Sequence, residues 1–177
     1  MIKKILIAPA RFIEAFLDRA IAFAGGLVFM QLPSFMVQYT QRLGGHLEEL
    51  GLIIKKYKLA AEESGKSLNE YISLHLNSGV KEFISSGKLM EENLERFDYL
   101  NQAYNSLHNS SGINKLLTFI KNIDITIAKE TWKDFTASIS LSYESIIYCL
   151  AGIVFFMTIY LLVKNLIIFS VKHIKRR

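Results

Sequence analysis

The sequence predicts an all-α membrane protein in which two transmembrane helices enclose an extracytoplasmic helical domain. Three observations predict this class. Apolar residues gather near the two ends of the 177-residue chain, basic residues flank those apolar runs, and the apolar residues between the runs recur at helical spacing. The length suits one ordinary domain rather than two.

Two apolar runs are long enough to cross a bilayer. Residues 145–163 carry no charged side chain over 19 positions, which as a helix is about 28 Å, close to the hydrocarbon thickness of a membrane. Residues 20–37 are interrupted only by Gln31, Pro33 and Ser34. A buried core helix is the alternative for residues 145–163, but a soluble domain of this length could hardly surround it. No small-x-small cleavage site follows the first run, so we expect it to be retained.

The charge distribution predicts the orientation. Residues 1–37 and 145–177 together carry nine Lys/Arg against two acids, a net charge of +7, whereas residues 38–144 carry twelve against fourteen, a net charge of −2. By the positive-inside rule, the segments 1–19 and 164–177 are cytoplasmic and residues 38–144 are extracytoplasmic. The short basic tail next to a span fits anionic lipid head groups, so we expect the bilayer as a partner and no nucleic acid.

The segment 1–19 reads as an amphipathic helix lying in the cytoplasmic interface before the chain turns inward. Its polar face holds Arg11, Glu14 and Asp18, and its apolar face holds Phe12, Ile13, Phe16 and Leu17. Pro9 argues against a helix that runs unbroken from the start.

Two glycine pairs predict close helix contacts. Gly25 and Gly26 lie in an Ala/Gly-rich surface of the first run, which would let a second helix approach closely. The partner is either the second run, at Ala151 and Gly152, or another copy of the chain. Gly44 and Gly45 interrupt a helical repeat just beyond the first run. Because each glycine costs a helix about 1 kcal/mol relative to alanine, we expect a bend or a helix contact there.

Heptad-like spacing predicts that the first run continues as a helix into water. Two apolar seams follow from this spacing, and they either close on each other within one chain or meet a neighbour. The first comprises Leu43, Leu47, Leu50, Ile54 and Tyr57, and the second comprises Phe97, Leu100, Tyr104 and Leu107. Near the outer end of the first run we expect Pro33 to kink the helix and Gln31 to need a polar partner.

Capping signals divide the rest of the central region. Ser67 to Glu70 has the capping-box form, and the sequence Asn77 to Gly79 is a plausible stop. We expect a short helix over 80–84, a break at Ser-Ser-Gly, the second seam helix, and a short helix over 113–120. Asp124 reads as the N-cap of a helix through Trp132 and Phe135. No sustained two-residue alternation occurs, so we expect little sheet.

The sequence offers no catalytic, cofactor-binding or metal-binding residues. His46, Glu48 and Glu49 could supply metal ligands, but no second matching pair accompanies them, and His75, His108 and His173 lack such neighbours. No Ser-nucleophile, zinc-protease or phosphate-loop motif is present, and the single cysteine, Cys149, lies within the second run. Trp132 reads as an anchor at the outer membrane interface, as core of the outer domain, or as a partner-binding residue.

Four segments resemble an uncharacterised family of bacterial two-span inner-membrane proteins, domain-of-unknown-function family 2937. They are "QLPSFMVQYTQRLGGHLEEL", "NSGVKEFISSGKLMEENLERFDYL", "IDITIAKETWKDFTASISLSYES" and the closing apolar run. The chain differs in lacking a proline after Asp124 and in its longer basic tail. The resemblance implies a bacterial inner-membrane topology and supplies no mechanism.

Two functions remain open at this point. The first is a non-enzymatic scaffold or interaction subunit, whose extracytoplasmic domain binds another envelope protein or a second copy. The alternative is a small oligomeric channel with residues 20–37 lining the pore. Ionisable residues that would mark an ion path are missing from the spans, apart from Lys164 at the edge of the second.

Overall fold

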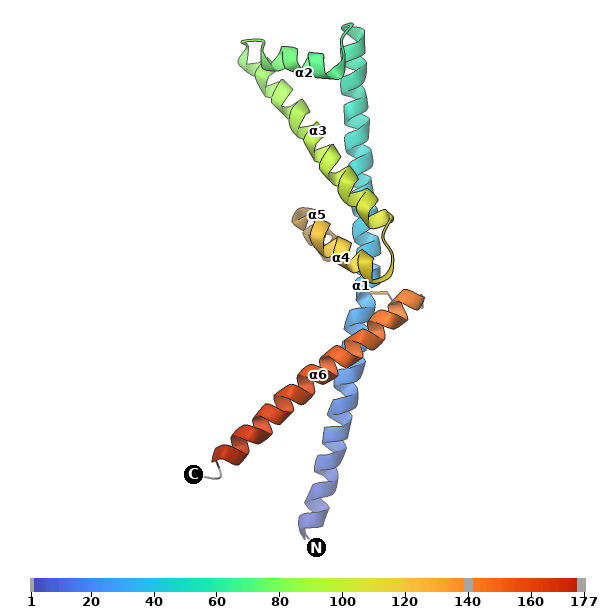
Figure 1. Cartoon of the computed structure of the whole chain (residues 1–177), viewed down its shortest axis with the longest axis vertical. Coiled ribbons are helices and arrows are strands. Elements are labelled where there is room, and N and C mark those ends of the chain that lie inside the picture. Colours follow the sequence, from blue (N-terminus) through green and yellow to red (C-terminus); the bar gives the residue numbers. More distant parts are fainter. Residues whose placement is uncertain (1, 139–141, 175–177) are drawn as a thin grey trace. The chain divides into compact units, whose positions relative to one another are not determined.

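The structure is a computed structural model that describes residues 2–138 and 142–174, with the side chains of these residues except 2–12, 14, 113, 168 and 170–174. Within these ranges the chain forms six helices and no strand, which confirms the all-α prediction for the described residues. In order they are α1 (Ile2–Glu63), α2 (Leu68–Leu76), α3 (Lys81–His108), α4 (Gly112–Asn122), α5 (Ile125–Lys133) and α6 (Tyr143–Ile174) (Figure 1).

The chain divides into two compact units. One consists of residues 1–36 and 136–177, and contains the first part of α1 together with α6; we call it the helix pair. The other consists of residues 37–135 and contains the rest of α1 and α2 to α5; we call it the lobe. Both α1 and α6 contain stretches long and apolar enough to cross a membrane.

α1 is longer and more regular than the sequence indicates. It continues through Pro9 and Pro33, so the break expected near the start is wrong for the described backbone. The placement of residues 1–19 in the cytoplasmic interface stays a prediction. A proline removes one hydrogen bond from a helix, and the turns on either side of it continue the helix here. The side chains of Arg11, Phe12 and Glu14 lie outside the described residues, as does most of the basic tail.

α3 is one helix where the sequence predicts two. It runs from Lys81 to His108 through Ser-Ser-Gly, because Gly87 is a packing residue rather than a break. A Cβ on Gly87 would lie 3.0 Å from the Cβ of His75 and from Leu76 on α2. The glycine therefore lets α2 cross α3 closely, which the local sequence does not reveal.

The helix starts at Ser67 and Asp124 are confirmed. The Ser67 side chain accepts a hydrogen bond from the Glu70 backbone N–H, and the Glu70 carboxylate accepts from the Ser67 backbone N–H at 2.8 Å. The Asp124 carboxylate accepts from the Ile127 backbone N–H at 3.0 Å. α2 ends before Asn77 as predicted, whereas α5 ends at Lys133, two residues short of Phe135.

Candidate functional site: interaction surfaces of the helix pair and the lobe

Three glycines let the two helices of the helix pair pack closely against each other. A Cβ on Gly25 would lie 2.7 Å from the Cβ of Phe156, and a Cβ on Gly152 would overlap the carbonyl oxygen of Gly25 and lie 2.6 Å from the Cβ of Phe29. A Cβ on Gly26 would lie 2.9 Å from the Sγ of Cys149. The partner of Gly25 and Gly26 is therefore α6, the second apolar run, and the contact is made at Gly152 and not at the exposed Ala151.

A polar cluster lies beside this crossing, within the helix pair. The Gln31 side-chain oxygen accepts a hydrogen bond from the Ser138 backbone N–H at 3.1 Å. The Ser34 hydroxyl donates to the Ser138 carbonyl at 3.4 Å and accepts from the Ser138 hydroxyl at 3.1 Å. The polar partner expected for Gln31 is thus the segment leading toward α6.

In the lobe, the two predicted seams meet each other. Leu43, Ile54, Leu100 and Leu107 are buried, and Leu47, Leu50, Tyr57, Phe97 and Tyr104 are half-buried. The Tyr57 hydroxyl accepts a hydrogen bond from the Asn93 side chain at 3.0 Å, and a Cβ on Gly51 would lie 3.5 Å from the Phe97 ring. The seams are therefore closed between α1 and α3, and their centre is not available to a second protein.

The two glycines of the second pair, Gly44 and Gly45, have different surroundings. A Cβ on Gly44 would lie 3.3 Å from the Tyr104 ring of α3, so Gly44 makes the expected helix contact. A Cβ on Gly45 would meet no atom within 4 Å, so the contact expected there is not made within the described chain. α1 continues as a helix through both residues.

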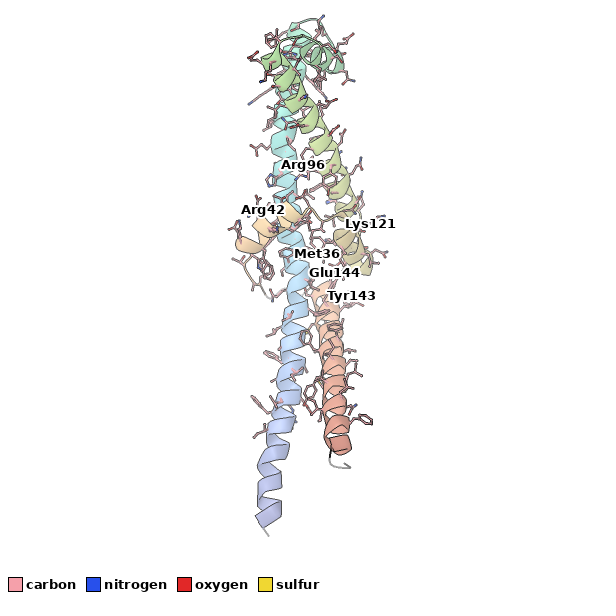
Figure 2. All side chains as sticks on the ribbon, turned by 90° about the vertical axis from the view of Figure 1, so that its left-hand side faces the viewer. Met36, Arg42, Arg96, Lys121, Tyr143 and Glu144 are labelled. Carbon is pink, nitrogen blue, oxygen red and sulfur yellow. The ribbon has the colours of Figure 1, made fainter. Side chains whose placement is uncertain are left out.

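Ion pairs connect α1 and α3 of the lobe to residues in and next to α5. Arg42 of α1 forms ion pairs with Asp134 and, at 3.7 Å, with Glu130, and His46 lies 3.6 Å from the same Glu130 carboxylate. Arg96 of α3 lies 2.7 Å from the Asp124 carboxylate. Arg42 and Arg96 are labelled in Figure 2. His46 therefore lies beside a carboxylate of α5 that Arg42 also approaches.

Asp124 is the most constrained acid of this network. Burial alone raises its pKa, but the hydrogen bond and charge of Arg96 and the hydrogen bond from the Ile127 backbone outweigh burial and hold its pKa below the ordinary value. Its backbone N–H donates to the buried Tyr39 hydroxyl at 2.8 Å. Burial raises the pKa of Tyr39, so its hydroxyl stays protonated at neutral pH. Sequence reasoning identified Asp124 as a cap and missed both long-range partners.

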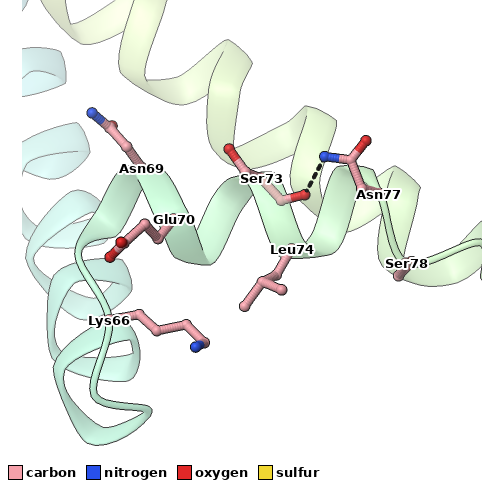
Figure 3. Close-up of a pocket in the computed structure, with 7 residues that line it drawn as sticks. All are labelled: Lys66, Asn69, Glu70, Ser73, Leu74, Asn77 and Ser78. Atoms are coloured by element: carbon pink, nitrogen blue, oxygen red, sulfur yellow. Dashed lines mark hydrogen bonds between the residues drawn. The ribbon is translucent and has the colours of Figure 1, made fainter.

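Several polar groups along α2 are already used within the helix. A 560 Å³ groove along α2 is lined by exposed residues, and its polar groups are used locally: the Glu70 carboxylate caps the helix, and the Asn77 amide donates to the Ser73 carbonyl at 2.8 Å (Figure 3). Among the described residues, no three His, Cys, Asp or Glu side chains gather as a metal site would require. His173 lies among the side chains that are not described.

Large apolar side chains are nevertheless exposed on the hairpin that α2 and α3 form. They are Leu74, Val80, Phe83 and Leu89. Leu74 and Phe83 line a hollow of 160 Å³ together with His75 and Ser78, and the His75 ring packs edge-to-face on Phe83 at 5.8 Å. Ligand pockets usually measure about 300–1,000 Å³, so this hollow fits an inserted side chain better than a small molecule.

Trp132 is exposed and is not part of the core of the lobe. Its side chain is 70% exposed and stacks on Phe135, with ring centroids 5.9 Å apart. This excludes, for the described chain, the reading in which Trp132 fills the core. The membrane-anchor and partner-binding readings remain predictions.

The chain was compared with protein families, with curated proteins and with solved structures. No curated protein and no solved structure matches it. The model of the family described as "Protein of unknown function (DUF2937)" matches residues 13–173, which is most of the chain and includes both apolar runs and the whole lobe. The chain therefore belongs to the DUF2937 family.

Proposed function

We propose that the chain is a non-enzymatic interaction subunit of the bacterial inner membrane, whose lobe lies on the extracytoplasmic side and binds another envelope protein through the α2–α3 hairpin. The membrane placement is supported by the exposure of the apolar runs. Only 11% of the apolar stretch of α6 is buried within the chain, whereas the core helix of a soluble protein is mostly buried. These side chains need apolar surroundings that the described residues do not supply.

The exposed apolar cluster on α2 and α3 is the observation that carries the interaction role. The two seams use their apolar groups on each other, so they cannot serve a partner without opening the lobe. Leu74 and Phe83 instead flank a hollow of side-chain size, with Phe83 53% exposed. Interfaces gain most from an aromatic or aliphatic anchor packed into such a hollow, surrounded by weaker contacts.

Site-specific crosslinking in intact cells tests this role. A photoreactive residue placed at Phe83 should give a specific adduct, whereas the same residue at the buried Leu107 should give none. Leu74→Asp should abolish the Phe83 adduct, and Leu52→Asp, which changes a somewhat more exposed leucine on α1, should leave it unchanged. An adduct of twice 20.2 kDa would identify a second copy as the partner. If neither Phe83 nor Leu89 yields an adduct sensitive to Leu74→Asp, the hairpin is not the binding surface.

The channel alternative draws no support from the helix pair. The side chains of Phe23, Leu27 and Val28, exposed on α1, are apolar, and the polar Gln31 is bonded to Ser138. A conducting pore needs a wet or polar lining, which would require these groups to be rearranged. Stretch- or voltage-evoked current from the reconstituted chain would favour the channel, whereas electrical silence with intact Phe83 adducts favours the interaction role.

A further inference from the structure

We infer that α4 and α5 present a lipid-binding face to anionic phospholipid head groups, with Trp132 as its aromatic anchor. The inference rests on the proposed membrane placement and extends it. It assigns a second surface of the lobe, apart from the α2–α3 hairpin, to the bilayer itself.

The first observation is the composition of the outer face of α5. Ile125, Lys129 and Trp132 follow one another at spacings of four and three, so they share one side of the helix, and all three are exposed. The opposite side holds Ile127 and Thr131, which are each 2% exposed. α5 therefore packs on the lobe through one face and turns a mixed apolar and basic face outward. This combination is typical of helices that lie in a membrane interface.

α4 repeats the pattern. Its Phe119 is buried against Tyr39, with ring centroids 5.0 Å apart, while Leu117 and Ile120 are 61% and 62% exposed and are followed by the exposed Lys121. α4 is strongly amphipathic by sequence, yet apolar side chains lie on both of its sides. The exposed pair is thus apolar surface that packing within the lobe leaves in water.

The charges of the α4–α5 region favour an anionic ligand. The region from Gly112 to Phe135 contains three acids, and each is paired with a cation from outside it: Asp124 with Arg96, Glu130 and Asp134 with Arg42. Its four basic residues are Lys115, Lys121, Lys129 and Lys133. None of them forms an ion pair with another residue whose side chain is described. The lysines therefore leave a local positive excess beside the exposed apolar side chains.

The position in the sequence and the aromatic chemistry favour lipid over a protein partner. Trp132 and Phe135 lie within eleven residues of Tyr143, where α6 begins, and Arg42 lies within a few residues of the end of the first apolar run in the same helix. Tryptophan prefers the head-group level of a bilayer, where its ring is apolar and its N–H stays hydrated. Lysines reach phosphate groups from the same level.

Trp132 is the single tryptophan of the chain and reports directly on this face. The full-length chain is reconstituted in phosphatidylcholine vesicles with and without phosphatidylglycerol, each with lipids brominated near the head group. In anionic vesicles we expect Trp132 emission at shorter wavelength, quenching by the brominated lipid, and protection from aqueous acrylamide. Protection should weaken in pure phosphatidylcholine and at high salt, because screening reduces the attraction of the lysines.

A paired variant tests the role of the lysines. Lys129→Gln with Lys133→Gln should reduce the ratio of lipid-bound to water-exposed Trp132 by about fivefold per lysine removed. Lys55→Gln with Lys56→Gln, two exposed lysines on α1, should leave the ratio unchanged. Equal acrylamide access in both vesicle types, without bromine quenching, overturns the inference. Protection from acrylamide without bromine quenching also overturns it, because a protein would then cover the face.

Failure of this inference can be told apart from failure of the proposed function. Flotation of the vesicles after an alkaline wash reports insertion of the two apolar runs. A chain that floats with Trp132 in water overturns the lipid-binding face and leaves the membrane placement standing. A chain that does not float overturns both. The partner-binding role is read separately by the adduct at Phe83.

Discussion

At the residue scale, Asp124 connects three helices. Its carboxylate caps α5 and pairs with Arg96 of α3, and its backbone N–H donates to Tyr39 of α1. Because its pKa is lower in the folded chain than in the unfolded chain, the stabilisation it provides is complete above the unfolded pKa of about 4 and is lost as pH falls through the folded pKa. We expect the free energy of unfolding to decrease in this acid range.

Two substitutions separate the cap from the charge. Asp124→Asn keeps a capping side chain and removes the ion pair, so it should abolish the part of the acid dependence due to Asp124 and cost at most about 1 kcal/mol, because Arg96 is partly exposed. Asp124→Ala also loses the cap, which should cost about 1 kcal/mol more. Urea titrations of the full chain in detergent micelles, followed by helical circular dichroism between pH 3 and 7, measure both effects. An unchanged acid profile in Asp124→Asn would contradict the assignment.

Tyr39→Phe tests the buried hydrogen bond on the other side of Asp124. The substitution keeps the ring that packs on Phe119 and leaves the Asp124 N–H without its acceptor. An unsatisfied buried donor costs about 1–3 kcal/mol. Tyr57→Phe, whose hydroxyl accepts from a partly buried Asn93, should lower the free energy of unfolding less. If both variants lose the same free energy of unfolding in these urea titrations, the burial of the hydrogen bond does not determine how much its loss destabilises the chain.

At the element scale, the sequence predicts a helix boundary correctly where the groups that form the boundary are neighbours in the sequence. Ser67 and Asp124 start helices because each side chain caps the backbone three residues on. The sequence predicts a helix break at Gly87, and this prediction is wrong because the glycine serves a contact with another helix. His75 and Leu76 of α2 approach it closely. Heptad-like spacing predicts which residues form the two apolar seams, but it does not say whether the seams pack on each other or on a second chain. In the structure the seam of α1 packs on the seam of α3. The charge network on Arg42 and Arg96 joins residues far apart in sequence, so no local pattern predicts it.

The glycines of the two long helices give a matched prediction. Gly152→Leu should destabilise the helix pair by about 1–3 kcal/mol or more, because its Cβ would overlap backbone and not the end of a flexible side chain. Gly45→Ala should instead stabilise the chain by about 1 kcal/mol, since its Cβ meets only open space in a helix interior. Thermal unfolding in detergent micelles measures both. If Gly45→Ala destabilises the chain, a partner occupies that face and the glycine is a contact after all.

At the scale of the whole molecule, the proposal depends on which side of the membrane each unit occupies. The apolar runs belong to α1 and α6, and the lobe is the chain between them. The basic residues outnumber the acids nine to two in the segments 1–37 and 145–177, which predicts that both ends stay in the cytoplasm. With that orientation the lobe would lie on the extracytoplasmic side, where the proposal has the Phe83 hollow bind an envelope protein and the α4–α5 face bind the outer leaflet of the inner membrane.

Reporter fusions test this arrangement. A reporter active only in the cytoplasm should work when fused after Arg177, and one active only outside should work when inserted at the exposed turn of Ser64 and Gly65, where Gly65 has a positive φ of 66° and a Cβ would meet no neighbour. The reciprocal fusions should be inactive. Exchanging Lys3, Lys4 and Arg11 for glutamine should reduce the difference in activity between the two reporters at each site, because Lys and Arg near the first span set its orientation. Activity of one reporter at both sites would place the lobe and the tail in the same compartment, and neither the partner surface nor the lipid-binding face could then operate as proposed.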